Sequence, residues 1–521
     1  MRILGPDGKP IQSGPPVAPE VVQAVEHAKA IAAQGEPHNA LQQMVFAFQE
    51  DVRSDLVVDT TIELLEQIVK LAGATNSQEL EIFRNIQNHR EDPSAYQQAG
   101  HWFAQSQQFF VSLPFFKRAK DLLGDAKNEL SQAVEMGLAQ VLMSLGAYEQ
   151  AVNTFHELND TYGSLPPWLL MELAECYALL RQTDAAEAVY QIAPAEAFEQ
   201  FAEFPSLPMI REEVGDLLAR VRDFDEVEEM ELCDWHYVQT RGVLIEMNPK
   251  PDPGQEQIQR AEANGEDEDD EPETEDETES EDGPKGSGRF IFFEPSEEDV
   301  AYIVGVSAAF LDAKGYAPTK LLWLGSDSEP LARLFGEWWE IEPENIREYR
   351  HGDNTDDESE LALLVMSHTY DVNLSLPIHA SESDSPEALN QMAEEQFYDL
   401  MQARAGMIVY ALDIRWTDRQ PMTPDVGGFM TQQCRLPWET QYVVNPTDGS
   451  VTEIEDHRTP QQVAEDIAKK FPDSAKCDEI AAELLEDYSI CTDLILDHRD
   501  GTLVRRPMVT HSPIKSPRLG F

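Results

Sequence analysis

The N-terminal part of the chain carries apolar residues three and four positions apart, which is the spacing of helices that bury one face. No strand-like alternation interrupts this spacing before about residue 221. Breakers such as Gly35-Glu36-Pro37 and Pro166-Pro167 divide it at intervals. The pattern predicts a helical domain over residues 19–225 that is built from antiparallel helix pairs.

Beyond residue 230 the chain changes to short apolar runs that alternate with amphipathic stretches. The run LALLVM is apolar throughout, which is typical of a strand that is buried on both faces. The alternation predicts an α/β layered domain with a mainly parallel sheet over residues 230–440, so the fold class is α plus α/β. The expected strands lie at 290–293, 320–324, 346–349, 361–366 and 407–412, and the expected helices at 296–314, 329–339 and 386–404.

Further short elements are expected on either side of these strands. Residues 235–238 and 243–247 are predicted as two strands around Arg241-Gly242, and residues 416–428 as a loop. A small α+β cap is predicted over residues 441–510. Its expected elements are hairpins with Asp-Gly turns at 442–451 and 494–504, and helices at about 460–470 and 477–487.

An acidic segment over residues 248–288 is too poor in apolar residues to order itself. Within it, 13 of the 17 residues at 266–282 are Asp or Glu. A predicted strand follows at once, so the segment is expected to be a loop inserted in the α/β domain. It either keeps the protein in solution or acts as a mimic that captures a basic partner. Residues 1–18 and 511–521 are expected to be disordered.

The net charge of −60, from 98 acidic and 38 basic residues, narrows the range of partners. It argues against coating bare nucleic acid and against docking on an anionic membrane, because both need a basic surface. The acidity fits either a salt-adapted host or the steering of a basic partner. No apolar run reaches the roughly 18 residues of a membrane helix, and the start lacks the apolar core of a signal peptide. A cytoplasmic protein is expected.

The five cysteines are odd in number and form no C-x-x-C pair. This spacing argues against a disulfide framework and against a zinc ribbon. Free thiols fit a reducing cytoplasm. No metal site and no cofactor are therefore expected. The cysteines are Cys176, Cys233, Cys434, Cys477 and Cys491.

Two segments of the helical region match at a constant offset of 35 residues. Small alanines recur where two helices would cross closely, and large aromatic residues recur where the next helix pair must be filled. Asn153 and Glu157 fall on the solvent side. The matched residues are Leu138, Ala139, Leu142, Tyr148, Ala151 and Phe155 with Leu173, Ala174, Tyr177, Thr183, Ala186 and Tyr190.

With this period and these residue types, residues of about 130–200 resemble the tetratricopeptide repeat family. Gln182-Thr183 departs from the Gly-x-aromatic turn of the first unit. A weaker unit precedes it, with Phe110, Phe116 and Ala119 in comparable places, and the helical spacing of the aromatic residues there favours buried packing over base stacking. The resemblance implies a scaffold with a concave face that binds a protein or peptide. The alternative is a plain helical support for the second domain.

Polar residues at the ends of the predicted strands are the candidates for chemistry, because ligands of such folds bind beyond the carboxyl ends of the strands. His368 follows a buried strand and would do acid–base work, with Asp371 near it in sequence. Asp413 would orient His368 if their strands are neighbours, and Arg415 follows closely. Ser367 and His368 point to opposite sides, so they form no triad with Asp413. The alternative is a histidine that only stabilises a loop.

The loop 325–329 precedes a predicted helix with Pro330 in its first turn. Ser328 or Asp327 is expected to cap that helix. A phosphate could bind the same backbone donors, but the acidic residues and the lack of a following Lys oppose this.

These features support three hypotheses of function. The first is an interaction scaffold, in which the repeats bind a protein or peptide partner and the α/β domain is a second binding or regulatory unit. The second is an enzyme of unknown reaction that acts at the strand-end loops. The third is an acidic mimic that captures a basic partner through residues 266–282. Neither nucleic acid nor a membrane is expected as a direct partner.

Overall fold

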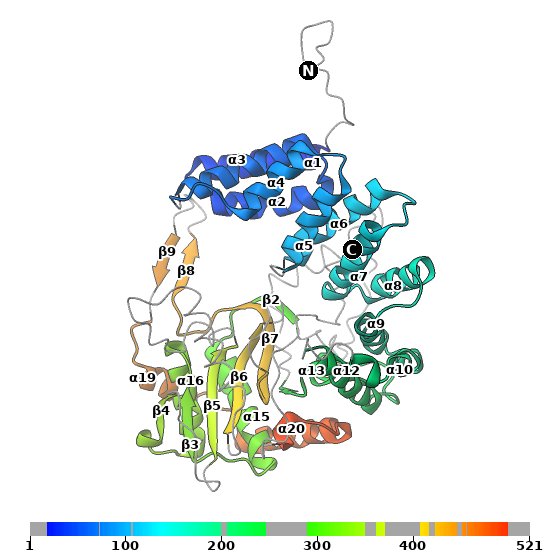
Figure 1. The fold of residues 1–521 in the computed structure, drawn as a ribbon. Helices are drawn as coiled ribbons and strands as arrows, with labels where there is room; N and C mark the ends of the chain where they lie inside the picture. The colour runs from blue at the N-terminus through cyan, green and yellow to red at the C-terminus, as the bar shows by residue number, and fades with distance from the viewer. Residues whose placement is uncertain are drawn as a thin grey trace, which may run out of the picture. The chain divides into compact units, whose positions relative to one another are not determined.

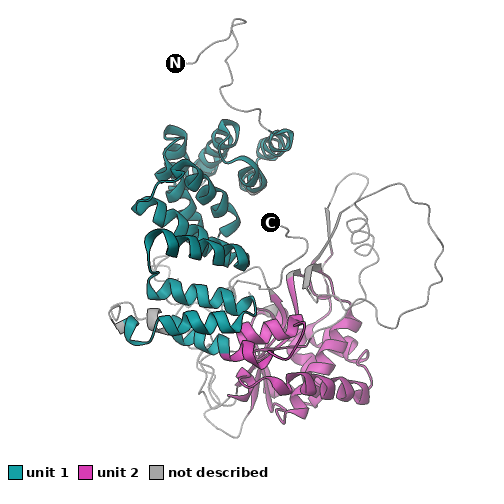
Figure 2. Ribbon diagram, turned by 90° about the vertical axis from the view of Figure 1, so that its right-hand side faces the viewer, with its two compact units in different colours: residues 1–218 teal, residues 219–521 magenta. Residues whose placement is uncertain are grey.

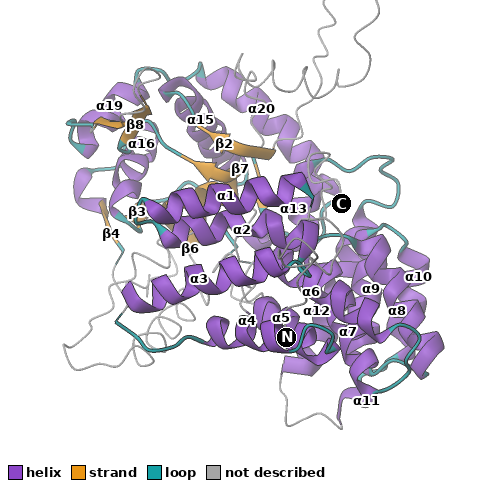
Figure 3. Ribbon diagram, turned by 90° about the horizontal axis from the view of Figure 1, so that it is seen from above, coloured by secondary structure: helices purple, strands orange, loops and turns teal. Residues whose placement is uncertain are grey.

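The computed structural model describes residues 18–71, 73–105, 108–199, 206–245, 289–349, 361–369, 407–415, 423–444, 451–454 and 456–498. Helices predominate among them, and they are accompanied by one parallel sheet and one hairpin (Figure 3). The chain divides into two compact units, residues 1–218 and residues 219–521 (Figure 2). No helix in the described ranges is both long enough and apolar enough to cross a membrane.

The described part of the first unit consists of helices joined by short turns (Figure 1). From α1 to α10, each helix packs against the next one along the chain, which agrees with the predicted helical domain. The helices are α1 (Pro19–Ala33), α2 (Pro37–Asp51), α3 (Asp55–Leu71), α4 (Gln78–Asn88), α5 (Pro93–Gln105), α6 (Phe109–Leu123), α7 (Glu129–Ser144), α8 (Tyr148–Tyr162), α9 (Pro167–Leu179), α10 (Thr183–Ile192), α11 (Glu196–Glu199) and α12 (Ser206–Asp223), the last of which runs into the second unit.

The turns of the pairs α7–α8 and α9–α10 have the same backbone conformation at an offset of 35 residues. Gly146 and Arg181 both adopt left-handed φ values, of 73° and 58°. The next residue of each turn, Ala147 or Gln182, donates its N–H five residues back, over 2.9 Å and 2.8 Å. A non-glycine residue pays a steric cost in the left-handed region. The conformation of the turn therefore repeats even where its sequence departs from the pattern.

A single ring, that of Phe116 on α6, fills the space between α5 and α7. Phe116 is 1 % exposed. Its ring touches both neighbouring helices so closely that a Cβ atom on Gly100 or on Gly137 would clash with it. The neighbouring Phe115 stacks on Phe103, with 5.5 Å between the ring centroids. Phe103, Phe115 and Phe116 are thus packed inside the helical unit, as the sequence predicts, whereas Phe110 is exposed.

The second unit contains a parallel sheet in the order β1–β7–β6–β5–β3–β4, with β2 also paired to β7. Its inner strands β5 and β6 carry apolar residues such as Leu364 and Val409 that are fully buried. This arrangement confirms the predicted parallel sheet. The strands are β1 (Val243–Leu244), β2 (Arg289–Phe293), β3 (Lys320–Trp323), β4 (Ile346–Glu348), β5 (Ala362–His368), β6 (Met407–Arg415) and β7 (Val426–Cys434).

The strands β1 and β2 lie along the same edge of β7. Val243 pairs with Val426 and Arg289 pairs with Met430, while β6 pairs with the opposite edge of β7. The chain therefore leaves the sheet after Ile245 and returns to the same strand position at Arg289. Residues 246–288, which include the acidic segment, are outside the described residues.

The helices of the second unit cover the sheet and include the two that were expected in a separate cap. The helix α19 packs against α16, and α20 packs against α15. The helix predicted at 386–404 lies outside the described residues. The helices are α13 (Leu232–Thr240), α15 (Glu297–Ala313), α16 (Glu329–Trp339), α19 (Pro460–Ala468) and α20 (Ser474–Asp487), with short 3-10 turns at Ser326–Ser328, Pro343–Asn345, Tyr488–Ile490 and Ile495–Asp497.

Three local predictions in the second unit are wrong. Residues 235–238 belong to α13 and not to a strand, because Glu231 and Asp234 form a capping box that starts a helix. The predicted loop at 416–428 includes the first residues of β7. The expected strand at Leu494 is replaced by a 3-10 turn, and the rest of that hairpin lies outside the described residues. The other hairpin is confirmed, with β8 (Gln441–Val444) antiparallel to β9 (Val451–Ile454).

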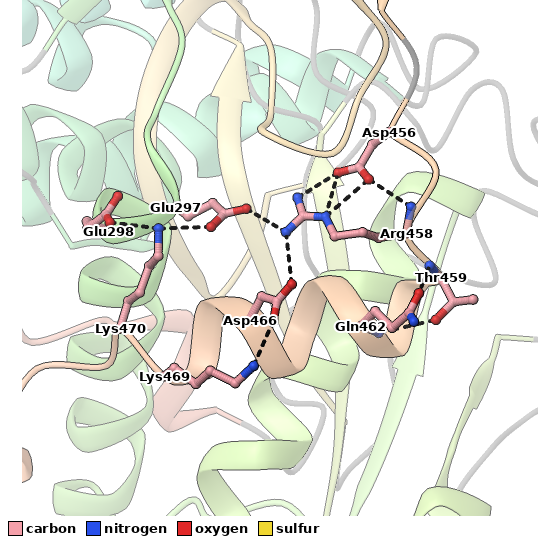
Figure 4. A network of polar contacts seen from close by, with 9 residues as sticks. All are labelled: Glu297, Glu298, Asp456, Arg458, Thr459, Gln462, Asp466, Lys469 and Lys470. Atoms are coloured by element: carbon pink, nitrogen blue, oxygen red, sulfur yellow. Dashed lines mark hydrogen bonds and ion pairs between the residues drawn. The ribbon is translucent and has the colours of Figure 1, made fainter.

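Arg458 connects the chain after β9 to the start of α15 (Figure 4). Its guanidinium pairs with Asp456 at 2.6 Å, with Glu297 at 2.7 Å and with Asp466 at 3.4 Å. Lys470, just after α19, also pairs with Glu297 at 2.9 Å. A guanidinium has several donors in one plane, so it can join carboxylates from different elements. The network holds α19 beside the N-terminus of α15.

Candidate functional site

His368 and Asp413 lie side by side at the carboxyl ends of two neighbouring strands. His368 is the last residue of β5, and it pairs in register with Asp413 of β6. Their side chains are 1 % and 0 % exposed. Because parallel strands end at the same edge of the sheet, their polar end residues converge there. The sequence predicted that Asp413 orients His368 only if their strands are neighbours, and the two strands are neighbours in the structure.

The imidazole of His368 lies between the carboxylates of Asp413 and Glu439. We use the name His368 cluster for these three residues together with Thr431 and Cys434. The Nδ1 atom is 3.0 Å from Asp413 Oδ2, and the Nε2 atom is 2.8 Å from Glu439 Oε1. Thr431 Oγ1 donates a hydrogen bond to the other oxygen of Asp413 at 2.7 Å. The backbone N–H of Leu436 donates to the other oxygen of Glu439, also at 2.7 Å. Both carboxylates are therefore fixed by a further donor.

The carboxylates of Asp413 and Glu439 favour the protonated form of the His368 imidazole. Burial lowers the pKa of His368, but the hydrogen bonds and the charges of Asp413 and Glu439 outweigh burial and raise that pKa to about 10. A protonated ring with both N–H groups engaged offers no free base at neutral pH. This state suits a structural link between strands better than acid–base work.

Ser367 turns away from this cluster, as the alternation of side chains along a strand requires. Its hydroxyl donates to the carbonyl of Asp327 at 2.8 Å, and its backbone N–H donates to Ser328 Oγ at 2.8 Å. The indole N–H of Trp438 donates to the same carbonyl at 2.8 Å. The prediction that Ser328 caps α16 is wrong, because the Ser328 hydroxyl makes no capping hydrogen bond. Its oxygen instead accepts the hydrogen bond from the backbone N–H of Ser367 in β5.

The side chains of the two remaining sequence candidates are outside what the structure describes. Asp371 lies outside the described residues. Arg415 is the last residue of β6 and pairs in register with Thr431, and its side chain is not described. Sequence reasoning missed Glu439, Thr431 and Cys434. The signal that could have found Thr431 and Cys434 is the apolar spacing of Val426, Phe429 and Met430, which marks one more strand whose end should carry polar residues. No local signal of this kind exists for Glu439, which lies beyond the strand.

A second group of polar side chains lies on three helices of the first unit, α7, α9 and α12. Glu172 and Glu175 lie one turn apart on α9 and are half-buried. Gln140 of α7 donates its amide N–H to Glu172 Oε1 at 2.9 Å. The other oxygen, Glu172 Oε2, is buried and has no hydrogen-bond partner among the described residues. We call Gln140, Glu172, Glu175 and Glu213 of α12 the carboxylate face.

Burial shifts the protonation of both glutamates on α9. It raises the pKa of Glu172 to about 7, against the hydrogen bond from Gln140 that lowers it. Burial also raises the pKa of Glu175 to about 8, and the negative charges of Glu172 and Glu213 raise it further. Neither glutamate has a Lys or Arg partner among the described residues. At neutral pH Glu172 and Glu175 are partly protonated, and no cation among the described residues balances their charge.

Comparison with known proteins gives little further information. No protein-family model matches the chain, and no curated protein matches it. Among solved structures, this chain is similar to the structure of PilF from Pseudomonas aeruginosa, with 13% sequence identity and a TM-score of 0.22. The match covers 40% of this chain and 85% of the PilF chain.

Proposed function

We propose that the first unit is a tetratricopeptide-like scaffold that binds a basic segment of a protein partner. Two observations support the repeat assignment for residues of about 130–200. The apolar residues recur at an offset of 35, and the turns at Gly146 and Arg181 share one conformation at the same offset. A stack of such pairs presents one face of every first helix to a ligand.

The observation that carries the proposal is the pair Glu172 and Glu175 on the first helix of the second repeat. Two half-buried carboxyl groups one helical turn apart are costly to ionise without a cation between them. A Lys or Arg side chain from a partner would supply that cation, and Glu172 Oε2 is an acceptor that no described residue uses. The same acidity that disfavours nucleic acid favours a basic peptide.

The enzyme hypothesis has weaker support in the described residues. Acid–base work by His368 would require a free ring nitrogen, and both nitrogens are engaged. The acidic mimic formed by residues 266–282 remains the second candidate, because it would attract the same basic partners.

Neutralising the carboxylate face should weaken the binding of a basic peptide to the full chain. We expect the double substitution Glu172→Gln and Glu175→Gln to raise the Kd of a fluorescein-labelled lysine-rich peptide about tenfold at pH 8.5, roughly 1.4 kcal/mol. At pH 6 the difference should shrink, because both glutamates are then largely protonated in the wild type. Fluorescence anisotropy at fixed ionic strength measures both values.

The matched control is the double substitution Glu26→Gln and Glu63→Gln, which removes the same charge from exposed positions of the same unit. It should bind the peptide as the wild type does. Equal weakening in both double variants would contradict the proposal and indicate attraction by the overall charge. If only deletion of residues 266–282 weakens binding, the acidic mimic is the correct function.

The same glutamates should make the stability of the first unit depend on pH. Their folded pKa values, about 7 and about 8, lie above the ordinary value of 4.5. The unfolded state therefore ionises first, and stability that is fully present below pH 4.5 is lost as the pH rises to about 8. We expect the Glu172→Gln, Glu175→Gln variant to gain about 2 kcal/mol over the wild type between pH 5 and pH 9, allowing for solvent screening at half-buried sites. Thermal unfolding across this range tests the sign, and the Glu26→Gln, Glu63→Gln variant should show no such trend.

A further inference from the structure

We propose that His368, Asp413 and Cys434 bind a zinc ion at the carboxyl end of the sheet. A ring nitrogen of His368, a carboxylate oxygen of Asp413 and the Cys434 Sγ atom all lie within 4.8 Å of one another, and all three residues are buried. His368 and Cys434 end the strands β5 and β7, and Asp413 lies two residues before the end of β6, the strand between them. Nitrogen, oxygen and sulfur donors in one buried site are the ligand types of zinc.

The separations fit ligands around one ion. With bonds of about 2.0 Å to nitrogen and oxygen, two ligands of a tetrahedral zinc site lie about 3.3 Å apart. His368 Nδ1 and Asp413 Oδ2 are 3.0 Å apart. A small movement of Cys434, which is 5 % exposed, would bring its thiolate within bonding distance of the same ion. Binding would displace the ring proton of His368 and the thiol proton of Cys434, which is the general behaviour of such ligands.

The surroundings of the three residues are those of a supported metal site. A ligating histidine usually donates its other ring N–H to a carboxylate, which sets its tautomer and orientation. Glu439 occupies that position, 2.8 Å from His368 Nε2, and the backbone N–H of Leu436 holds Glu439 in turn. Thr431 does the same for the second oxygen of Asp413. The protein has therefore already fixed the orientation of the histidine and the carboxylate.

The ligand set selects among divalent cations. Magnesium and calcium take oxygen ligands and gain little from a thiolate or an imidazole. Zinc accepts all three donor types, and three protein ligands leave its fourth position to water or a further group. The cysteine spacing did not predict this site because its ligands come from separate strands, and a search for C-x-x-C pairs detects only ligands that are close in sequence.

Metal binding can be tested on the full chain with zinc and cobalt as probes. The protein is stripped with a chelator and then titrated with Zn²⁺ against a chromogenic competitor. A large excess of Mg²⁺ occupies the exposed carboxylates, which prefer hard cations. We expect one tightly held Zn²⁺ per chain, and a Co²⁺ form with a thiolate-to-cobalt absorption band in the near ultraviolet. Zn²⁺ should also raise the thermal unfolding temperature, because it binds only the folded site.

Two variants and one control decide the outcome. The nearly isosteric Cys434→Ser should abolish the thiolate band, and Glu439→Gln should lower the zinc affinity by about 10- to 100-fold while keeping the band. Cys477→Ser, at a buried cysteine of α20 that packs beside Gly305, should behave as the wild type. Circular dichroism confirms folding of each variant. Absence of Zn²⁺ binding in excess Mg²⁺ by the folded wild type, or a thiolate band that survives Cys434→Ser, would overturn the proposal.

Discussion

Replacing Phe116 by alanine is expected to destabilise the helical unit by about 3–5 kcal/mol, the usual cost of emptying a buried phenylalanine site. The ring is 1 % exposed and fills the space that Gly100 and Gly137 leave between their helices. Neither glycine carries side-chain atoms that could move into the cavity. Backbone strain at these glycines would be needed to close it, so the site should collapse poorly.

Hydrogen exchange followed by mass spectrometry can measure this effect in the full chain, because it reports on α5, α6 and α7 separately from the second unit. Phe110→Ala is the matched control on the same helix. Phe110 is 37 % exposed, and its loss should cost less than about 1 kcal/mol. Similar exchange in both variants would show that Phe116 does not hold these helices together.

The second large effect is expected at Gly428 in β7. A Cβ atom there would lie 2.5 Å from the backbone carbonyl oxygen of Leu412 on the neighbouring strand β6. A carbonyl in the middle of a sheet cannot move away without breaking its ladder. Gly428→Ala should therefore cost about 3 kcal/mol or more, at the upper end of overpacking effects, and should loosen β6 and β7 together.

Gly427→Ala is the control in the same strand. Its Cβ atom would meet the terminal methyl group of Ile414, which can rotate into another conformation. We expect a loss of about 1 kcal/mol. Urea unfolding of the full chain, monitored by exchange in residues 407–434, compares the two. An equal effect of both substitutions would mean that the backbone contact of Gly428 is not the limiting one.

The sequence predicted those parts of the fold in which one signal dominates. The helical spacing of residues 19–225 and the apolar strand at 361–366 are of this kind. The strand β7 escaped notice because Gly427 and Gly428 interrupt its apolar residues. A Cβ atom at these two positions would meet the Ile414 side chain or the Leu412 carbonyl. The stretch 235–238 reads equally well as helix or strand, and only the cap formed by Glu231 and Asp234 decides.

The candidate site was predictable to the extent that it follows from strand ends. His368 and Asp413 each follow an apolar run, and once the two strands are neighbours their side chains must meet. Glu439 lies beyond the end of β7 and contacts His368. No local sequence pattern predicts that the chain after β7 turns back toward β5. The carboxylate face was also missed, because polar residues on a helix look solvent-exposed until the neighbouring helices are placed.

The strands β1 and β2 pair with the same edge of β7, so the two ends of the segment between them lie close together. Leu244 pairs with Gly427 and Arg289 with Met430, so the two ends of the intervening segment are separated by only three residues along β7, about 10 Å. Doubling the length of a flexible connection costs only about 0.6 kcal/mol in closure entropy. We therefore expect that changes in the number of residues between Ile245 and Arg289 destabilise the sheet little, so this position should accept a spliced reporter domain.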